Sequence, residues 1–260
     1  MNLHKSVIIK SHHLVVYILM LVLLLATTAN TLAQNIPTPP KVSFKKVLPE
    51  AEKGDPQAAY IVAVMYHNGA KDVTQDYKKS VKYFTLSAEQ GIALAQYNLA
   101  MMYYDGTKIP QNDALAFRWY RLSALQGLPQ AQYGLATVYQ EGRGTPKNIQ
   151  QALLWYKRSA AQGYGLAQDK LGYLYSNGIG VETNIVEAYK WYSLAATRGV
   201  SSAVTSRDDL HAQMTNSQIV KAQRAAMSFK PTPHYNADEI KRQKALIEAR
   251  AKEIQASSQQ

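Results

Sequence analysis

Apolar residues recur along the chain at the three- and four-residue spacing of helices. Each apolar stripe ends at a glycine or a turn, as an amphipathic helix does when a residue of positive φ closes it. Two such stripes are Leu99, Met102 and Tyr103 before Gly106, and Ala116, Trp119, Tyr120 and Ala124 before Gly127. Turn-forming residues separate the stripes, as in Glu141-Gly142-Arg143-Gly144-Thr145-Pro146. The pattern therefore predicts an all-α protein of short helices joined by tight turns.

The predicted helices belong to a unit of about 36 residues that is repeated along the chain. Its closing glycines are separated by 37, 36, 36 and 36 residues, and they are Gly54, Gly91, Gly127, Gly163 and Gly199. Aromatic residues precede each of the last four, at Tyr83, Trp119, Tyr120, Trp155, Tyr156, Trp191 and Tyr192. Because a two-helix unit cannot bury its apolar face alone, neighbouring units must stack, and these rings are predicted to pack in the core against alanines.

We therefore predict an α/α superhelix, or solenoid, of helix-turn-helix repeats. Four repeats are expected at residues 55–91, 92–127, 128–163 and 164–199, after a capping half-repeat at 43–54. They are followed by a helical pair at 200–229, a proline-containing linker at 230–236, a helix at 237–256 and a disordered end at 257–260. We expect the helix at 237–256 to pack over the last repeat as a cap, and the alternative is a detached basic helix for a partner.

Two recurring phrases carry a resemblance to a known family. One is seen as Ser87-Ala88-Glu89-Gln90-Gly91 and Ser123-Ala124-Leu125-Gln126-Gly127, and the other as Tyr97-Asn98-Leu99-Ala100 and Tyr133-Gly134-Leu135-Ala136. These phrases resemble the Sel1-like repeats, relatives of the tetratricopeptide repeats with a slightly longer unit and a glycine-rich connector. The resemblance implies a bacterial adaptor, with roles in envelope assembly, regulation of cell-wall enzymes, signalling or host-cell entry. The first unit departs from it, with Ala70-Lys71-Asp72 in the connector.

The N-terminal segment is predicted to be a secretory signal peptide, residues 1–33. Lys5 and Lys10 precede an apolar run at residues 14–26, and small residues follow. We place cleavage between Ala33 and Gln34, with Ala29 as a second candidate, and residues 34–42 become a linker. The apolar run is shorter than the roughly 20 residues that span a bilayer, so no integral membrane anchor is expected after cleavage. The chain has no cysteine, which fits export to a Gram-negative periplasm, with secretion as the alternative.

The formal charge of +11 falls to +9 when the two lysines of the predicted signal are removed. The basic residues are scattered, so most of this charge is interpreted as a solvated surface. An exported chain meets anionic lipid, glycan or acidic protein before nucleic acid, so no nucleic-acid partner is predicted and an envelope glycan is a further candidate contact. A basic glycan- or membrane-binding role, including host interaction, is therefore one alternative function.

No catalytic or cofactor motif occurs, and we predict no enzyme activity, cofactor or metal site. The histidines beyond the predicted signal are dispersed, at His67, His211 and His234. Asp105 and Glu141 lie at equivalent places and could form a glycosidase pair, but Asn68 and Asn177 occupy the same place in the outer units. These residues are interpreted as polar helix ends. A cell-wall enzyme acting on β-lactams or peptidoglycan remains an alternative that the resemblance implies, although the cysteines of those relatives are missing.

Binding of a protein or peptide is the predicted function. The repeats differ from one another at four positions of the first helix, spaced 4, 3 and 4 residues apart, which share one side of that helix. Tetratricopeptide-like arrays line their concave surface with this side, and residues there are free to vary. The candidate binding positions are Gln57, Ile61, Val64, Asn68, Leu94, Asn98, Met101, Asp105, Gln130, Gly134, Thr137, Glu141, Leu166, Lys170, Tyr173 and Asn177. The alternative is that they merely face solvent.

Overall fold

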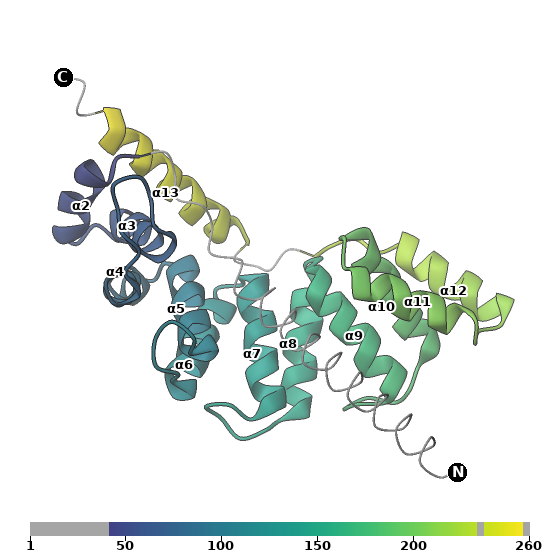
Figure 1. The fold of residues 1–260 in the computed structure, drawn as a ribbon. Helices are drawn as coiled ribbons and strands as arrows, with labels where there is room; N and C mark the ends of the chain where they lie inside the picture. Colours follow the sequence, from purple (N-terminus) through teal and green to yellow (C-terminus); the bar gives the residue numbers. More distant parts are fainter. Residues whose placement is uncertain (1–41, 233–236, 257–260) are drawn as a thin grey trace, which may run out of the picture. The chain divides into compact units, whose positions relative to one another are not determined.

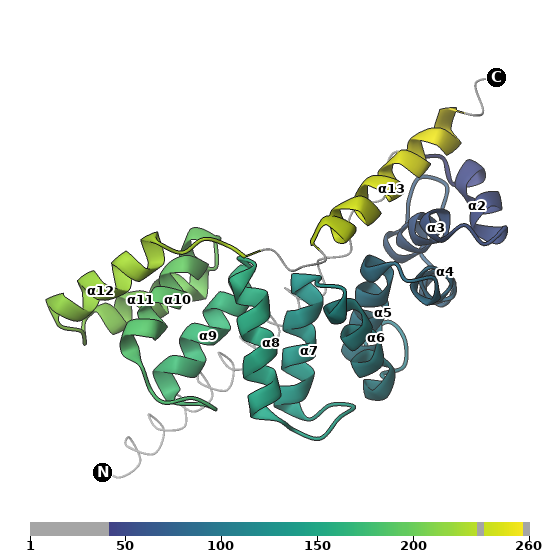
Figure 2. The ribbon, with the colours of Figure 1, turned by 180° about the vertical axis from the view of Figure 1, so that it is seen from behind.

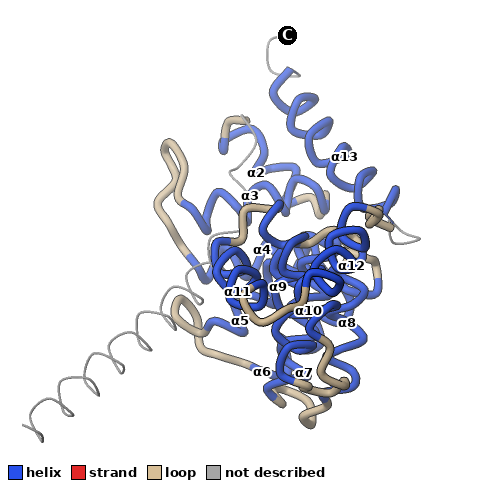
Figure 3. The backbone as a smooth tube through the Cα atoms, turned by 90° about the vertical axis from the view of Figure 1, so that its right-hand side faces the viewer, coloured by secondary structure: helices blue, strands red, loops and turns tan. Residues whose placement is uncertain are grey.

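The computed structural model describes residues 42–232 and 237–256, and the fold is built from these residues. The predicted signal peptide, its Ala33–Gln34 cleavage site, nearly all of the linker at 34–42 and the end at 257–260 lie outside them. In the described part, helices are joined by loops and no strand is present beyond one isolated bridge (Figure 3). The predicted all-α solenoid is confirmed.

Each predicted repeat contains two helices, and consecutive helices pack against each other along the chain (Figure 1). The helices are α2 (Phe44–Glu52), α3 (Pro56–Asn68), α4 (Tyr77–Glu89), α5 (Ala93–Asp105), α6 (Asp113–Leu125), α7 (Pro129–Glu141), α8 (Ile149–Ala161), α9 (Gly165–Asn177), α10 (Ile185–Thr197), α11 (Ser201–His211), α12 (Asn216–Met227) and α13 (Ala237–Ala256). The first helices of the four repeats are thus α3, α5, α7 and α9, and the second helices are α4, α6, α8 and α10.

The two helices of a repeat begin in different ways. Each second helix starts at an Asp or Asn whose side chain accepts a hydrogen bond from the backbone three residues on; these are Asp76, Asn112, Asn148 and Asn184. The first helices α5, α7 and α9 start after apolar residues that give no side-chain cap, at Ile92, Leu128 and Tyr164. The five closing glycines all have φ between 81° and 97°, so the chain reverses there in a conformation that disfavours a side chain.

The connectors within repeats pack against the preceding unit. A Cβ at Gly144 would lie 2.1 Å from the backbone oxygen of Asp113, and one at Gly180 would lie 2.4 Å from the side chain of Ile149. The connector of the first repeat forms its turn without a pair of glycines. Asp72 adopts a φ of 65°, and Ala70 forms an isolated bridge with Val73. Its unusual sequence therefore still forms a tight turn.

The core contains aromatic rings among alanines and aliphatic side chains, together with buried serines on the second helices. Of the predicted core rings, Tyr83, Trp119, Tyr120, Trp155, Tyr156 and Tyr192 are buried, and Trp191 is half-buried with its ring centroid 5.7 Å from that of Phe229. Three equivalent serines on second helices donate to carbonyls at the start of the first helix: Ser87 to Pro56, Ser123 to Ala93 and Ser159 to Pro129, at 2.7–2.8 Å. Each bond fixes one helix of a repeat on the other.

The C-terminal part departs from the prediction. The pair α11 and α12 packs on α10, and α12 begins after Thr215 in a capping box with Gln218. Helix α13 contacts α3 and α2, so the expectation that it caps the last repeat is wrong, and it is not detached either (Figures 1 and 2). The physical reason is charge: Arg250 of α13 pairs with the carboxylates of Asp55, at the start of the first repeat, and of Glu50 in α2. No described helix is both long and apolar enough to span a membrane.

Candidate binding surface

The sixteen candidate positions of α3, α5, α7 and α9 together form what we call the inner face, and the structure divides them. Five side-chain positions are buried and cannot meet a partner in this conformation, which corrects the prediction for Ile61, Val64, Asn98, Met101 and Gly134. The physical reason is that side chains of neighbouring helices cover these positions: Asn98 bonds to Tyr60 of α3, and the ring of Tyr120 of α6 fills the space at Gly134. The remaining eleven are partly or fully exposed.

One set of equivalent positions shows how the burial changes along the array. In the first two repeats the amide of Asn98 lies 3.4 Å from the hydroxyl oxygen of Tyr60 and donates to it. The residue equivalent to Asn98 in the third repeat is Gly134, and the ring of Tyr120 fills the space where a side chain would be, with ring atoms 2.4–2.8 Å from an added Cβ. As a result, the hydroxyl of Tyr97, which is the equivalent of Tyr60, is buried without a hydrogen-bond partner.

Tyrosines gather on this side of the second, third and fourth repeats. The rings of Tyr97 and Tyr104 lie 6.2 Å from the ring of Tyr120, and that of Tyr133 lies 5.5–5.6 Å from the rings of Tyr156 and Tyr164. Burial raises the pKa of Tyr164 to about 12 and the pKa of Tyr97 further still. These two hydroxyls therefore carry no charge at physiological pH and stay neutral to a higher pH than an ordinary tyrosine.

Helix α9 carries an exposed aromatic residue of the inner face. Tyr173 is 45% exposed, and the Lys170 ammonium lies 5.2 Å from its ring centroid. Burial lowers the pKa of Lys170, with Glu141 and Asp169 opposing the change, and burial raises the pKa of Asp169. One oxygen of Asp169 accepts from Ser202 at 3.3 Å, and the other is buried without a partner. An exposed ring, a cation and an unpartnered acceptor thus lie on one helix.

The two carboxylates considered for glycoside hydrolysis each accept a hydrogen bond from a nearby side chain. Glu141 accepts a hydrogen bond of 2.8 Å from the hydroxyl of Tyr104, and Asp105 accepts one from Thr107. Arg143 stacks 3.8 Å from the ring centroid of Tyr104 and pairs with Asp113 at 2.7 Å. These contacts join the second and third repeats, which is the arrangement expected of polar helix ends.

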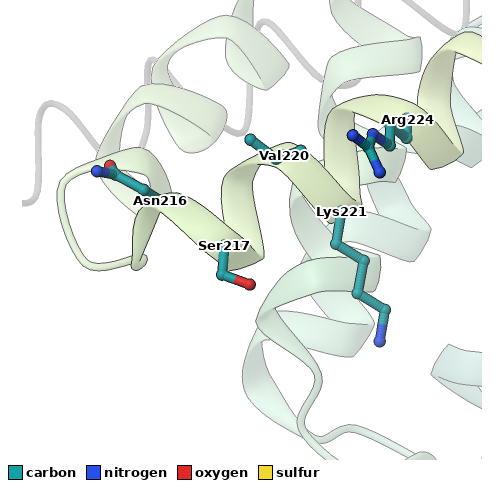
Figure 4. Close-up of a pocket in the computed structure, with 5 residues that line it drawn as sticks. All are labelled: Asn216, Ser217, Val220, Lys221 and Arg224. Carbon is teal, nitrogen blue, oxygen red and sulfur yellow. The ribbon is translucent and has the colours of Figure 1, made fainter.

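Other features of the surface do not form a convergent site. A shallow depression on α12 is lined by Asn216, Ser217, Val220, Lys221 and Arg224, but Ser217 and Lys221 extend to the side of the helix opposite Val220 (Figure 4). No group of three His, Asp or Glu side chains that could hold a metal occurs among the described residues. His67 contacts the ring of Tyr77, His211 that of Tyr189, and His234 lies outside the described residues.

Sequence reasoning missed the polar residues of α13 that contact the first two repeats. Gln243 and Arg250 belong to the helix that was expected to cap the last repeat. In its sequence, isoleucines seven residues apart, such as Ile247 and Ile254, indicate a packed face. The structure buries Ile247 and Ile254 together with Ala251 and Gln243. Spacing could reveal that α13 has an apolar face, but it could not reveal the surface that this face covers.

Comparison with known proteins places the repeats in a family. The model of the Sel1 repeat matches residues 56–92, 93–128, 129–164 and 165–200. The crystal structure of a protective antigen present in uropathogenic Escherichia coli strains, displaying an SLR fold, is 29% identical with a TM-score of 0.66, covering 81% of this chain and 43% of that chain. A Sel1 repeat protein from Oxalobacter formigenes is 28% identical with a TM-score of 0.58, covering 69% of this chain and 76% of that chain.

The chain therefore spans less than half the length of the Escherichia coli antigen. No curated protein matches it.

Proposed function

Because the chain belongs to the Sel1 repeat family, whose members are generally protein-interaction scaffolds, we propose that it is a non-catalytic adaptor. It binds a protein or peptide partner on the inner face of the third and fourth repeats. The observation that carries the proposal is the exposure of Tyr173 on α9, beside Lys170, at a position that is buried in both N-terminal repeats.

A half-exposed ring on a rigid helix suits recognition of a protein. Aromatic side chains bring a large contact area at a low cost in conformational entropy, which is why they are frequent in binding hot spots. The ring of Tyr192 packs so closely on Gly172 of α9 that an added Cβ would lie 2.6 Å from it, and this packing keeps α9 in place before a partner arrives. Little ordering is therefore needed on binding.

The adaptor is further proposed to act in the bacterial envelope after export. This part rests on the N-terminal sequence alone, with its two lysines, its apolar run and the small residues before Gln34. N-terminal sequencing of the protein purified from the periplasm tests it. A chain that begins at Gln34 supports export with cleavage, whereas a chain that begins at Met1 in the cytoplasm contradicts it.

Site-specific photo-crosslinking tests the binding surface. A photoreactive phenylalanine replaces Tyr173 in one variant and Leu154 of the neighbouring helix α8 in the other, since the two side chains are 45% and 41% exposed. We expect a specific protein adduct from position 173 and none from position 154. Adducts of equal yield at both positions, or at neither, contradict an inner-face site.

Salt separates this proposal from a charge-driven contact with glycan or lipid. At 1 M salt the Debye length is only about 3 Å, so attraction by scattered lysines is screened while groove contacts persist. The crosslink at position 173 should survive this condition. Binding should be lost in a variant that carries Lys170→Ala, Tyr173→Ala and Asn177→Ala. If salt alone removes the crosslink, the basic-surface alternative explains the binding better.

A further inference from the structure

The turns between repeats form an edge of the array, and α13 lies along its N-terminal part. This turn edge consists of the closing glycines, the glutamines before them and the first residues of the helices that follow. In the N-terminal repeats it includes Asp55, Gly91, Ala93 and Gln126, each of which contacts α13. The turn edge is separate from the inner face, so a role for it does not depend on the proposed function.

Glutamine amides connect the turn edge within the array. Gln90 donates to the carbonyl of Gly54 at 2.9 Å, and Gln162 donates to the carbonyl of Gly127 at 3.0 Å. Gln126 and Gln162 also donate, at 2.8 Å, to the side-chain oxygens of two equivalent glutamines, Gln96 and Gln132. An amide at this edge is thus the group that the repeats themselves use to join adjacent turns.

Gln243 of α13 enters this network as if it belonged to a repeat. Its amide nitrogen lies 3.4 Å from the carbonyl oxygen of Gly91, the place that Gln90 and Gln162 fill at the neighbouring turns. It also donates to Gln126 at 3.2 Å, while its oxygen accepts from the backbone nitrogen of Ala93 at 3.0 Å. Helix α5 has no side-chain cap of its own. Gln243 therefore supplies the missing cap from another part of the chain.

Arg250, seven residues further along α13, contacts the start of the first repeat. Its guanidinium donates to Asp55 at 2.7 Å and to Glu50 at 2.8 Å, and Asp55 in turn caps α3 through Ala58. Burial by itself lowers the pKa of Arg250, but the bond to Asp55 and the nearby carboxylates raise it overall. Helix α13 therefore makes polar contacts with two helix starts: the amide of Gln243 contacts that of α5, and the guanidinium of Arg250 contacts that of α3.

The apolar part of this contact is small. Ile247, Ala251 and Ile254 are the buried apolar side chains, one between Gln243 and Arg250 and two after them, whereas Leu246 is 44% exposed. A cleft of about 360 Å³ remains between α2 and α13, lined by residues that include Lys46, Pro49 and Glu253. A helix held by a few buried side chains and partly exposed ion pairs lies at the low end of local stability, where opening is frequent.

We propose that the N-terminal turn edge is a helix-recognition site which α13 fills in cis as an exchangeable clasp, and that α13 of a second copy of this chain can take its place. The site recognises an amphipathic helix. That helix has glutamine and arginine seven residues apart, with isoleucine or alanine between and after them. Docking in cis has the advantage of effective concentration, so the intramolecular helix occupies the site unless it is weakened. Exchange of an identical element between copies is a low-cost route to association.

A labelled peptide of residues 237–256 tests the site by fluorescence anisotropy. The full mature chain should bind it weakly because its own α13 competes, and Arg250→Glu, which weakens the clasp and leaves the turn edge intact, should bind it at least about tenfold more tightly. Equal binding to both proteins, or binding to neither, overturns the proposal. If Arg250→Glu does not fold, Gln243→Ala serves in its place with the same expectation.

Ala93→Pro provides a matched control on the receptor side. Proline removes the N–H whose hydrogen bond Gln243 accepts, and it is tolerated because the equivalent residue of the third repeat is Pro129 and Ile92 has the extended conformation that precedes a proline. Added to Arg250→Glu, it should weaken peptide binding at least about tenfold. Unchanged binding shows that the peptide contacts another surface and contradicts the proposed site.

Amide exchange gives an independent readout in the chain without peptide. The backbone nitrogens of Ser43 and Ala93 both donate to side chains of α13, whereas that of Ala116 bonds within its own helix start. Arg250→Glu should accelerate exchange at Ser43 and Ala93 by about tenfold and leave Ala116 unchanged. Unchanged protection of all three shows that α13 stays docked, which contradicts an exchangeable clasp.

Discussion

The two N-terminal repeats and the two C-terminal repeats share a template but present different surfaces. At one inner position the chain has Val64 and Met101 in the first pair and Thr137 and Tyr173 in the second. The first two side chains are buried, Thr137 bonds to the hydroxyl of Tyr156 at 3.1 Å, and Tyr173 is 45% exposed. The N-terminal repeats therefore use this position for packing, and the last repeat uses it as surface.

The turn edge differs between the same two regions. In the N-terminal repeats α13 supplies an amide to Ala93 and a guanidinium to Asp55. In the fourth repeat Arg198 replaces the glutamine of the earlier turns, and the side-chain oxygen of Gln168, buried there, has no partner. Repeats with the same backbone can thus differ at their turn edges. In the N-terminal repeats α13 supplies hydrogen-bond partners, whereas in the fourth repeat the buried oxygen of Gln168 has none.

The largest expected effect tests whether the C-terminal repeats are stacked as tightly as the N-terminal ones. Trp155→Ala removes a ring that is 7% exposed between repeats, and it should lower the free energy of unfolding by about 3–5 kcal/mol. Leu154→Ala on the same helix is the control, because that side chain is 41% exposed and should cost little. Urea denaturation followed by circular dichroism measures both, and equal midpoints would place Trp155 outside the core.

A second variant tests the effect of having Gly134 in the third repeat, at the position equivalent to Asn98 in the second. Gly134→Asn restores an amide near Tyr97, but its Cβ would lie 2.4 Å from the ring of Tyr120. We expect overpacking to dominate and the protein to lose about 1–3 kcal/mol of stability. If Gly134→Asn is stabilising, the ring of Tyr120 moves aside and the unpartnered hydroxyl of Tyr97 is the larger cost.

Asn98→Ala is the reciprocal change in the N-terminal repeats. It leaves the hydroxyl of Tyr60 buried without its donor, which should cost about 1–3 kcal/mol. The two variants, compared by urea denaturation, separate the cost of an unsatisfied hydroxyl from the cost of crowding.

These variants also indicate how far the sequence alone can be trusted. Glycine spacing and the recurring sequence motifs specified the helices and the family, which are confirmed, because those signals are local and recur about every 36 residues. The burial of Asn98 could not be predicted, because it depends on the hydrogen bond that its side chain makes to Tyr60 of another helix. The place of α13 could not be predicted either, since Arg250 and Asp55 are 195 residues apart and nothing in their neighbourhoods marks the pairing.

Asp113 and Asp169 have pKa values shifted in opposite directions, so they should affect the pH dependence of stability in opposite ways. The hydrogen bond from Arg143 lowers the pKa of Asp113, while burial raises the pKa of Asp169 above the ordinary value of 3.8. Asp113 therefore contributes stability above pH 3.8 that is lost as the pH falls through its folded pKa. For Asp169 the sign is reversed, because its ionisation in the folded state is disfavoured and stability falls as the pH rises above 3.8.

We accordingly expect Asp113→Asn to destabilise the protein at pH 7 by about 0.5–1 kcal/mol and Asp169→Asn to stabilise it slightly. Both differences from the parent should shrink in acid, as the two carboxyls become protonated. Thermal unfolding at pH 7 and at about pH 3 measures how far they shrink. A destabilising effect of Asp169→Asn at pH 7 would mean that the bond from Ser202 outweighs the burial of the charge.

The smallest expected effect is the sharpest test of the comparison. Tyr173→Ala should change the free energy of unfolding by less than about 0.5 kcal/mol, because nearly half of the side chain is in water. Met101→Ala, at the equivalent position of the second repeat, removes a side chain that is 6% exposed and should cost about 2–5 kcal/mol. Urea denaturation of the pair measures the contrast. A stable Tyr173→Ala protein that no longer binds its partner has lost a contact and not a fold, whereas equal destabilisation by both variants would make Tyr173 part of the core and remove the physical basis of an inner-face site.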